Sequence, residues 1–126
     1  MIFVFGSNKA GRHGKGAAAY ARRCHGAIYG RGFGLQSNSY AIPTKDEYLK
    51  TLPIETIAAY IDEFKAFARD HYWLQFNVTK IGCGFAGYIP SEIAPLFKDS
   101  PPNVHLNESF QEILNNKNSI SKFTED

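Results

Sequence analysis

The chain has 126 residues, of which 44% are hydrophobic, and a formal net charge of +2, values typical of one folded domain. They exclude a disordered or fibrous chain, and no apolar run approaches the ~20 residues that span a bilayer. The two cysteines, Cys24 and Cys83, have neither metal-site spacing nor a disulfide framework. We therefore expect a single domain over residues 1–116, a frayed tail over 117–126, a cytoplasmic location, no metal and no cofactor.

Charge is distributed unevenly along the chain. Residues 1–44 carry six Lys or Arg and no Asp or Glu, and eight of the eleven glycines precede residue 35. From Asp46 onward, acidic residues outnumber basic ones. This asymmetry favours an anionic ligand that is bound by the first third of the chain.

The predicted elements alternate between strands and helices. The first strand, "IFVF", follows Met1 directly, so no signal peptide is expected. Hydrophobic runs and helical periodicity predict strands over 2–5, 39–43, 75–82 and 103–106, and helices over 16–24, 53–70, 90–97 and 108–116. Residues 26–38 read as a loop, Gly26 as the stop of the first helix and Ser91 as a helix cap. The alternation predicts an α/β fold with a mostly parallel sheet covered on both faces.

Three loops follow the first three predicted strands. They are "GSNKAGRHGKG", "TKDE" and "GCGFAGY". In open α/β sheets, ligands bind outside the carboxyl ends of the strands, so these loops should converge on one site. Glycine lets backbone amides approach a phosphate closely, and a helix N-terminus adds a positive dipole end. The three loops therefore predict a site for a phosphate or diphosphate.

Known phosphate motifs fit this pattern poorly. "GKGAAA", residues 14–19, matches the dinucleotide fingerprint formally, but no acidic residue lies about 20 positions further on to bind a ribose. No Gly-Lys-Ser/Thr sequence is present for a P-loop. The interleaved aromatic residues of a nucleic-acid stacking platform are also missing.

Three motifs together resemble the macrodomains, a family of ADP-ribose-binding domains. They are "NKAGRHGKGAA" (8–18), "SYAIPTK" (39–45) and "IGCGFAGY" (81–88). The resemblance is closest to the branch that includes the macrodomain antitoxin of the DNA ADP-ribosylating toxin pair and the terminal ADP-ribose protein glycohydrolase. It implies a three-layer α/β/α sandwich with a mostly parallel mixed sheet.

The resemblance also implies which residues bind the ligand. Asn8 matches the asparagine that faces the distal ribose, although a plain turn residue is the alternative. Cys83 is expected to be a small buried residue and not a nucleophile. His13 has no clear counterpart in the family, and it either contacts the ligand or is simply exposed. Phe85 and Tyr88 either flank the distal ribose or belong to the core. The full expected binding set is Gly6, Ser7, Asn8, His13, Gly14, Gly16, Thr44, Gly82, Cys83, Gly84, Phe85, Ala86, Gly87 and Tyr88.

Lys45 matches the lysine that attacks the anomeric carbon of the distal ribose in the resembling enzymes. This chemistry requires an unprotonated amine. A solvated lysine, or one that only pairs with phosphate, is the alternative. Asp46 is a candidate proton carrier, provided that the chain turns so that both side chains reach the site. Ala86 stands where the protein-directed glycohydrolase has an aspartate, a departure that the antitoxin branch shares.

The resemblance leaves three functions open. The chain is an ADP-ribosyl glycohydrolase acting on DNA or protein, as in a small phage or bacterial hydrolase. Alternatively, it is a non-catalytic reader or sponge for free ADP-ribose or a cyclic ADP-ribose signalling derivative. The third function is an enzyme that acts on ADP-ribose 1″-phosphate. In each case the expected partner is ADP-ribose or a molecule that carries it.

Overall fold

The structure is a computed structural model that describes the backbone of residues 1–124 and the side chains of residues 1–116. Its strands are β1 (Ile2–Asn8), β2 (Gly34–Gln36), β3 (Ser39–Lys45), β4 (Phe76–Val78) and β5 (Val104–Leu106). Its helices are α1 (Gly16–Cys24), α2 (Ile54–Asp70), α3 (Pro90–Ile93), the 3₁₀ helix η1 (Ala94–Phe97) and α4 (Glu108–Thr124). All eight predicted elements are present: α1 has the predicted ends, the predicted helix over 90–97 is divided into α3 and η1, and the other elements have shifted ends.

The five strands form one sheet in the order β2-β3-β1-β4-β5. β3, β1, β4 and β5 run parallel to one another, and β2 runs antiparallel to β3 at the edge. The mostly parallel mixed sheet is therefore confirmed. β2 lies in the segment that we predicted to be a loop, so that prediction is wrong over Gly34–Gln36. Three residues that follow a glycine-rich stretch are too few to show a strand period.

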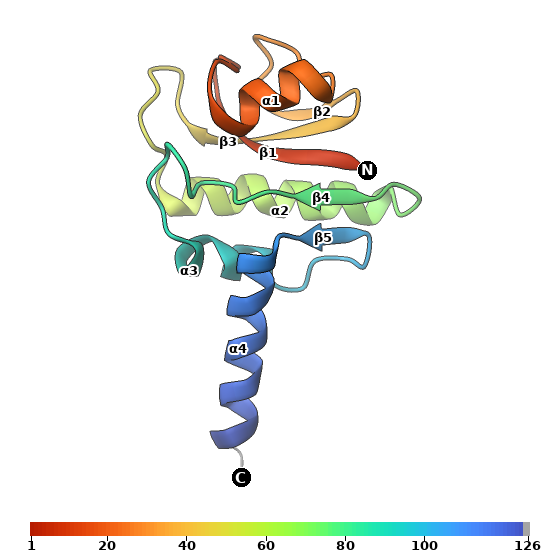
Figure 1. Ribbon diagram of the computed structural model, residues 1–126, viewed down its shortest axis with the longest axis vertical. Helices are drawn as coiled ribbons and strands as arrows, with labels where there is room; N and C mark the ends of the chain where they lie inside the picture. Colours follow the sequence, from red (N-terminus) through yellow and green to blue (C-terminus); the bar gives the residue numbers. More distant parts are fainter. Residues whose placement is uncertain (125–126) are drawn as a thin grey trace.

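Helices cover both faces of the sheet, which confirms the three-layer α/β/α arrangement (Figure 1). On one face, Val4 and Ile42 belong to the main core together with residues of α2, α3, η1 and α4. On the other face, Phe5 and Ala41 pack with Ala18 and Ala21 of α1. Alternate residues of β1 thus enter two separate cores, as expected for a central strand buried on both faces.

The helix patterns explain where α1 and α2 lie. The buried residues of α2 are Ile57, Ile61, Phe64 and Ala68, all of which follow helical spacing. α1 ends at Cys24, and Gly26 follows in the left-handed region at φ +75°, which supports its predicted role as a stop. The predicted cap Ser91 is wrong, because α3 begins one residue earlier, at Pro90.

α4 is longer than predicted. We expected this helix to end at residue 116, but it continues to Thr124 and projects away from the sheet (Figure 1). Its N-terminal part contacts α3 and η1, where Phe110 is buried. The division into a domain of 1–116 and a frayed tail of 117–126 stays a prediction, and residues 125–126 lie outside the described part. Over the described residues, no helix combines the length and apolar composition needed to cross a membrane.

Candidate functional site

A cavity of about 530 Å³ opens at the carboxyl ends of β1, β3 and β4. The loops after these three strands and the first turn of α1 form its walls, so the three loops converge as the sequence predicts. Eleven of the expected site residues line it, namely Gly6, Ser7, Asn8, Gly14, Thr44, Lys45, Gly82, Cys83, Gly84, Phe85 and Ala86. Asp46, His13, Gly16, Gly87 and Tyr88 do not line it.

Asn8 shapes the first loop as well as lining the cavity. Its Oδ1 accepts a hydrogen bond from the Arg12 backbone N–H at 2.9 Å, and its Nδ2 donates to the Arg12 carbonyl at 3.1 Å. Both ends of the amide are therefore used to close the turn over residues 8–12. The turn-residue interpretation of Asn8 is supported by these contacts, while the side chain still stands at the cavity wall.

The first turn of α1 presents backbone amides beside the cavity. α1 begins at Gly16, has no side-chain cap and carries no acidic residue in its first turn. The N–H groups of this turn have no partner within the helix, and the positive end of the helix dipole lies with them. Ala17 and Ala18 of this turn line the cavity. This end of α1 is suited to bind an anion.

Gly16 itself lies under the ring of Phe85. Its φ is +58°, and a Cβ at this position would lie 3.1 Å from Phe85 Cε2. Glycine is therefore required both by the backbone and by the ring. Although Gly16 does not line the cavity, it allows Phe85 of the loop after β4 to meet α1.

Lys45 is half-buried at the end of β3 and lines the cavity. Its Nζ lies 5.7 Å from the centroid of the Phe85 ring, and Lys15 Nζ lies 5.9 Å from the same centroid. Both distances are within the range of a cation–π contact. Two ammonium groups from separate loops thus meet at one exposed aromatic ring.

Asp46 is not brought into the cavity. Its Oδ1 accepts hydrogen bonds from the backbone N–H groups of Tyr48, at 2.8 Å, and Lys50, at 2.9 Å. The carboxylate therefore closes the turn that follows β3. The condition that both Lys45 and Asp46 reach the site is not met, because neighbouring residues at a strand end point in different directions.

The loop after β4 is fastened to the segment before α2. The Tyr88 hydroxyl donates to the Leu52 carbonyl at 2.6 Å, and the Thr51 hydroxyl donates to the Ala86 carbonyl at 2.8 Å. Tyr88 thus supports the loop from outside the cavity. Cys83 lines the cavity, and burial is the main cause that raises the pKa of its thiol. A raised pKa keeps the thiol neutral, in line with the prediction that it is not a nucleophile.

His13 lies in the core behind the first loop and is 1% exposed. Its ring meets the Phe5 ring edge-on at 5.3 Å, and its Nε2 lies 3.4 Å from Ser7 Oγ. The pKa of His13 is lowered, first by burial and then by the nearby charge of Arg22. His13 therefore does not line the cavity itself, but it contacts Ser7, which does.

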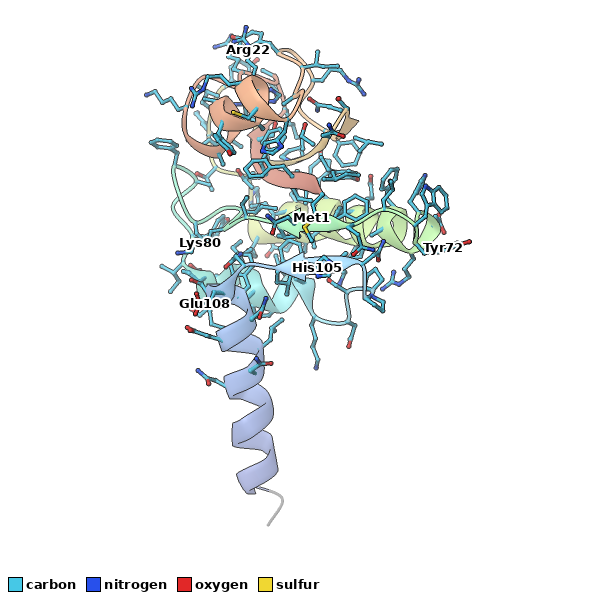
Figure 2. All side chains as sticks on the ribbon, turned by 45° about the vertical axis from the view of Figure 1, so that its right-hand side comes forward. Met1, Arg22, Tyr72, Lys80, His105 and Glu108 are labelled. Carbon is cyan, nitrogen blue, oxygen red and sulfur yellow. The ribbon has the colours of Figure 1, made fainter. Side chains whose placement is uncertain are left out.

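Four cationic side chains line the cavity, those of Arg12, Lys15, Lys45 and Lys80. Figure 2 shows Lys80 in the loop that follows β4 and Arg22 at the top of the view, on α1. Among the lining residues that the structure describes there is no carboxylate. No group of three or more His, Cys, Asp or Glu gathers within the described part of the chain to hold a metal.

Sequence reasoning missed several lining residues, notably Tyr29, Leu49, Thr79 and Lys80. Lys80 directly precedes "IGCG", and this position beside the motif could have identified it as a lining residue. Tyr29 lies in the glycine-rich loop 26–38, and the guanidinium of Arg22 stacks over its ring at 4.8 Å. No local pattern in the sequence marks Tyr29 or Leu49.

Comparison with known proteins identifies the fold. No family model matches the sequence, and no curated protein matches it significantly. The fold is similar to that of Thermosipho africanus DarTG in complex with ADP-ribose. The TM-score is 0.59 at 15% sequence identity, and the match covers 86% of this chain and 38% of that chain. This chain thus spans less than half of the solved protein, and the likeness is one of fold, which is macrodomain-like.

Proposed function

We propose that the chain binds ADP-ribose, or an ADP-ribosyl group, in this cavity and hydrolyses the ADP-ribosyl linkage on DNA or protein by means of Lys45. One observation carries the proposal: the cavity at the carboxyl ends of β1, β3 and β4 is lined by four cationic side chains and by no described carboxylate. A diphosphate is the complementary ligand. The fold similarity to a protein solved with ADP-ribose supports the choice of this diphosphate.

Binding uses amides more than side chains in this proposal. The diphosphate rests on the uncapped first turn of α1 and on the glycine loop 82–87. Lys15 and Lys80, which both line the cavity, balance its charge. The distal ribose then lies toward Lys45, whose Nζ is 5.7 Å from the centroid of the Phe85 ring.

Lys45 is the proposed nucleophile. Its neutral amine attacks the anomeric carbon of the distal ribose, and the bond to the modified group breaks with its electron pair leaving on that group, which takes up a proton. Water then cleaves the ribosyl–lysine bond, giving free ADP-ribose and restoring the amine. The half-buried position of Lys45 beside the cavity is the geometric support for this role.

A non-catalytic binder of ADP-ribose, or of a cyclic ADP-ribose derivative, is the second candidate. It is favoured by the position of Asp46, whose carboxylate is held in a turn. Ala86 also offers no acid in the loop after β4. A binder needs the cations and amides of the cavity, but it needs no proton carrier.

Single-turnover release of ADP-ribose from modified DNA and modified protein separates the two candidates. For a hydrolase, we expect Lys45→Ala to reduce release by about 1,000-fold or more while free ADP-ribose still binds. Lys50→Ala is the matched control, because this exposed lysine lies in the loop that follows Lys45 and does not line the cavity. Release that persists in Lys45→Ala contradicts the lysine mechanism. ADP-ribose binding without release from either substrate supports the binder.

A further inference from the structure

A second cavity, of about 420 Å³, lies along β3 and is not used by the proposed function. β2 pairs with β3 only as far as Ala41, and Pro43, two residues further on, lines this cavity. The other lining residues come from the loop after β1, the segment before β2 and α2; they are Lys9, Arg31, Gly32, Phe33 and Tyr60. The volume falls within the range of about 300–1,000 Å³ that is usual for small-molecule sites.

The second cavity adjoins the first one. The Lys9 N–H donates to the Lys45 carbonyl at 2.9 Å, so a residue of the second cavity is hydrogen-bonded to the backbone of the proposed nucleophile. Asn8, next to Lys9, lines the first cavity, and a Cβ on Gly32 would collide with the Asn8 carbonyl. Because Gly32 has no side chain, the segment before β2 packs directly on the loop after β1. A group attached to the ribose at Lys45 therefore has the second cavity next to it.

The charged side chains that line the second cavity are both cations, Lys9 and Arg31. Both are exposed, and neither takes part in a salt bridge among the residues that the structure describes. The Arg31 guanidinium donates one long hydrogen bond, of 3.5 Å, to the Leu35 carbonyl, which leaves most of its donors free. Glu63, three residues after Tyr60 on α2, does not line the cavity. The second cavity therefore favours an anionic group.

An aromatic ring lies beside these two cations. Phe33 is 38% exposed, and its ring centroid lies 5.2 Å from that of Tyr60 and 6.0 Å from that of Tyr40. Tyr40 is buried in the main core, so these contacts fasten the exposed ring to the core. Exposed aromatic rings beside cations are the groups on which single-stranded nucleic acids stack their bases and pair their phosphates. The sequence shows no such pattern, because these residues meet only in the fold.

We propose that the second cavity binds a nucleotide neighbouring the ADP-ribosylated one, with its base stacked on Phe33 and its phosphate paired with Lys9 and Arg31. The inference rests on the proposed function, and of the two substrates named there, DNA and protein, it selects DNA. The DNA is single-stranded, since a base must leave its stack to lie on Phe33. An acidic peptide would pair with the two cations but leave the aromatic ring unused.

The stacking contact is tested by binding of a short single-stranded oligonucleotide that carries one ADP-ribosylated base. The chain carries Lys45→Ala throughout, so that the substrate is not cleaved, and fluorescence anisotropy measures the affinity. Phe33→Leu keeps an apolar side chain against Tyr60 but removes the ring, and it should weaken binding about ten-fold. Phe33→Tyr should restore most of the affinity, and free ADP-ribose should bind all variants equally. Unchanged oligonucleotide affinity in Phe33→Leu overturns the inference.

Matched controls come from residues that line neither cavity. Trp73→Leu removes an aromatic ring that is 63% exposed, and Arg23→Ala removes an exposed cation of α1. Both should bind the modified oligonucleotide as tightly as the chain without these changes. A loss in Trp73→Leu equal to that in Phe33→Leu would contradict a specific role for Phe33.

The phosphate contacts are tested by the salt dependence of the same binding. Lys9→Ala and Arg31→Ala should each reduce the slope of log affinity against log salt by about 0.7, the loss of one phosphate contact to a single strand. Arg23→Ala should leave the slope unchanged. Slopes in Lys9→Ala and Arg31→Ala that equal the slope of Arg23→Ala would contradict phosphate binding in the second cavity.

Two further ligands separate the alternatives. With an ADP-ribosylated peptide, Phe33→Leu should cause no loss, and a ten-fold loss there would contradict the selection of DNA. If the unsubstituted chain binds no ADP-ribose, the proposed function fails. The second cavity still predicts weak, salt-dependent binding of an unmodified single-stranded oligonucleotide that Phe33→Leu removes. Binding of this oligonucleotide that is the same in Phe33→Leu and the unsubstituted chain overturns the inference, whatever happens with ADP-ribose.

Discussion

Phe85 is a solvent-exposed aromatic residue that lies against Gly16 and beside two lysines. Its ring is 67% exposed, yet it covers Gly16 and lies within reach of the ammonium groups of Lys15 and Lys45. A cation–π contact at such an exposed position contributes only about 0.5–1 kcal/mol. The ring therefore contributes little to stability, and it lies beside Lys45 at the part of the cavity where the distal ribose is proposed to lie.

His13 makes a separate prediction at the residue scale. Its pKa is lowered in the folded chain, chiefly by burial, so the unfolded chain binds more protons in the range where the two states differ. Stability should therefore fall as the pH drops below about 6.5, the unperturbed value, toward the lower folded pKa. Urea unfolding at pH 7 and at pH 5 measures this change.

The control for this pH effect is His13→Gln, which cannot titrate. We expect the free energy of unfolding of His13→Gln to change less between the two pH values than that of the unsubstituted chain. An equal change in both chains would assign the acid sensitivity to other groups and contradict the account of His13.

At the scale of elements, the loop after β4 depends on the segment before α2. Two hydrogen bonds join them, from Tyr88 to the Leu52 carbonyl and from Thr51 to the Ala86 carbonyl. Ala86 and the two residues before it, Gly84 and Phe85, line the cavity. Contacts outside the cavity thus hold one of its walls. Tyr88 supports the site in this way although it does not line the cavity.

Tyr88→Phe tests this dependence. Loss of the 2.6 Å hydrogen bond to Leu52 should reduce the free energy of unfolding by about 1 kcal/mol and weaken ADP-ribose binding, because the loop then loses its support. Chemical denaturation and calorimetry measure the two effects. Tyr72→Phe is the matched control, since Tyr72 is 76% exposed and does not line the cavity. Unchanged binding by a destabilised Tyr88→Phe would show that the loop does not need this contact.

At the scale of the whole molecule, the sequence predicts most of the strands and helices. β1 begins as a continuous apolar run, and α2 follows helical spacing at Ile57 and Ile61, so both elements are recognisable without tertiary information. β2 has only three residues, and its pairing with β3 is a tertiary contact that no local pattern encodes. The continuation of α4 beyond residue 116 has only two apolar residues, Ile120 and Phe123, which are too few to predict a helix.

The site is predicted at the level of its loops and less well at the level of side chains. Parallel strands bring their carboxyl ends to one edge, so the convergence of the three loops follows from topology. Side-chain direction depends on local hydrogen bonds that the sequence does not show. Asp46 turns to the N–H groups of Tyr48 and Lys50, and Tyr88 turns to Leu52. Tyr29 enters the cavity wall from the loop between α1 and β2, which belongs to none of the three motifs.

Calorimetric titration with ADP-ribose tests the central claim, that this cation-lined cavity is a site for ADP-ribose. We expect saturable one-to-one binding that weakens as salt is raised, because charges contribute to it. Lys15→Ala, within the cavity wall, should bind more weakly than the unsubstituted chain, whereas Arg23→Ala, an exposed α1 residue that does not line the cavity, should bind equally well. No binding at millimolar ADP-ribose, or equal binding by both variants, would contradict the account.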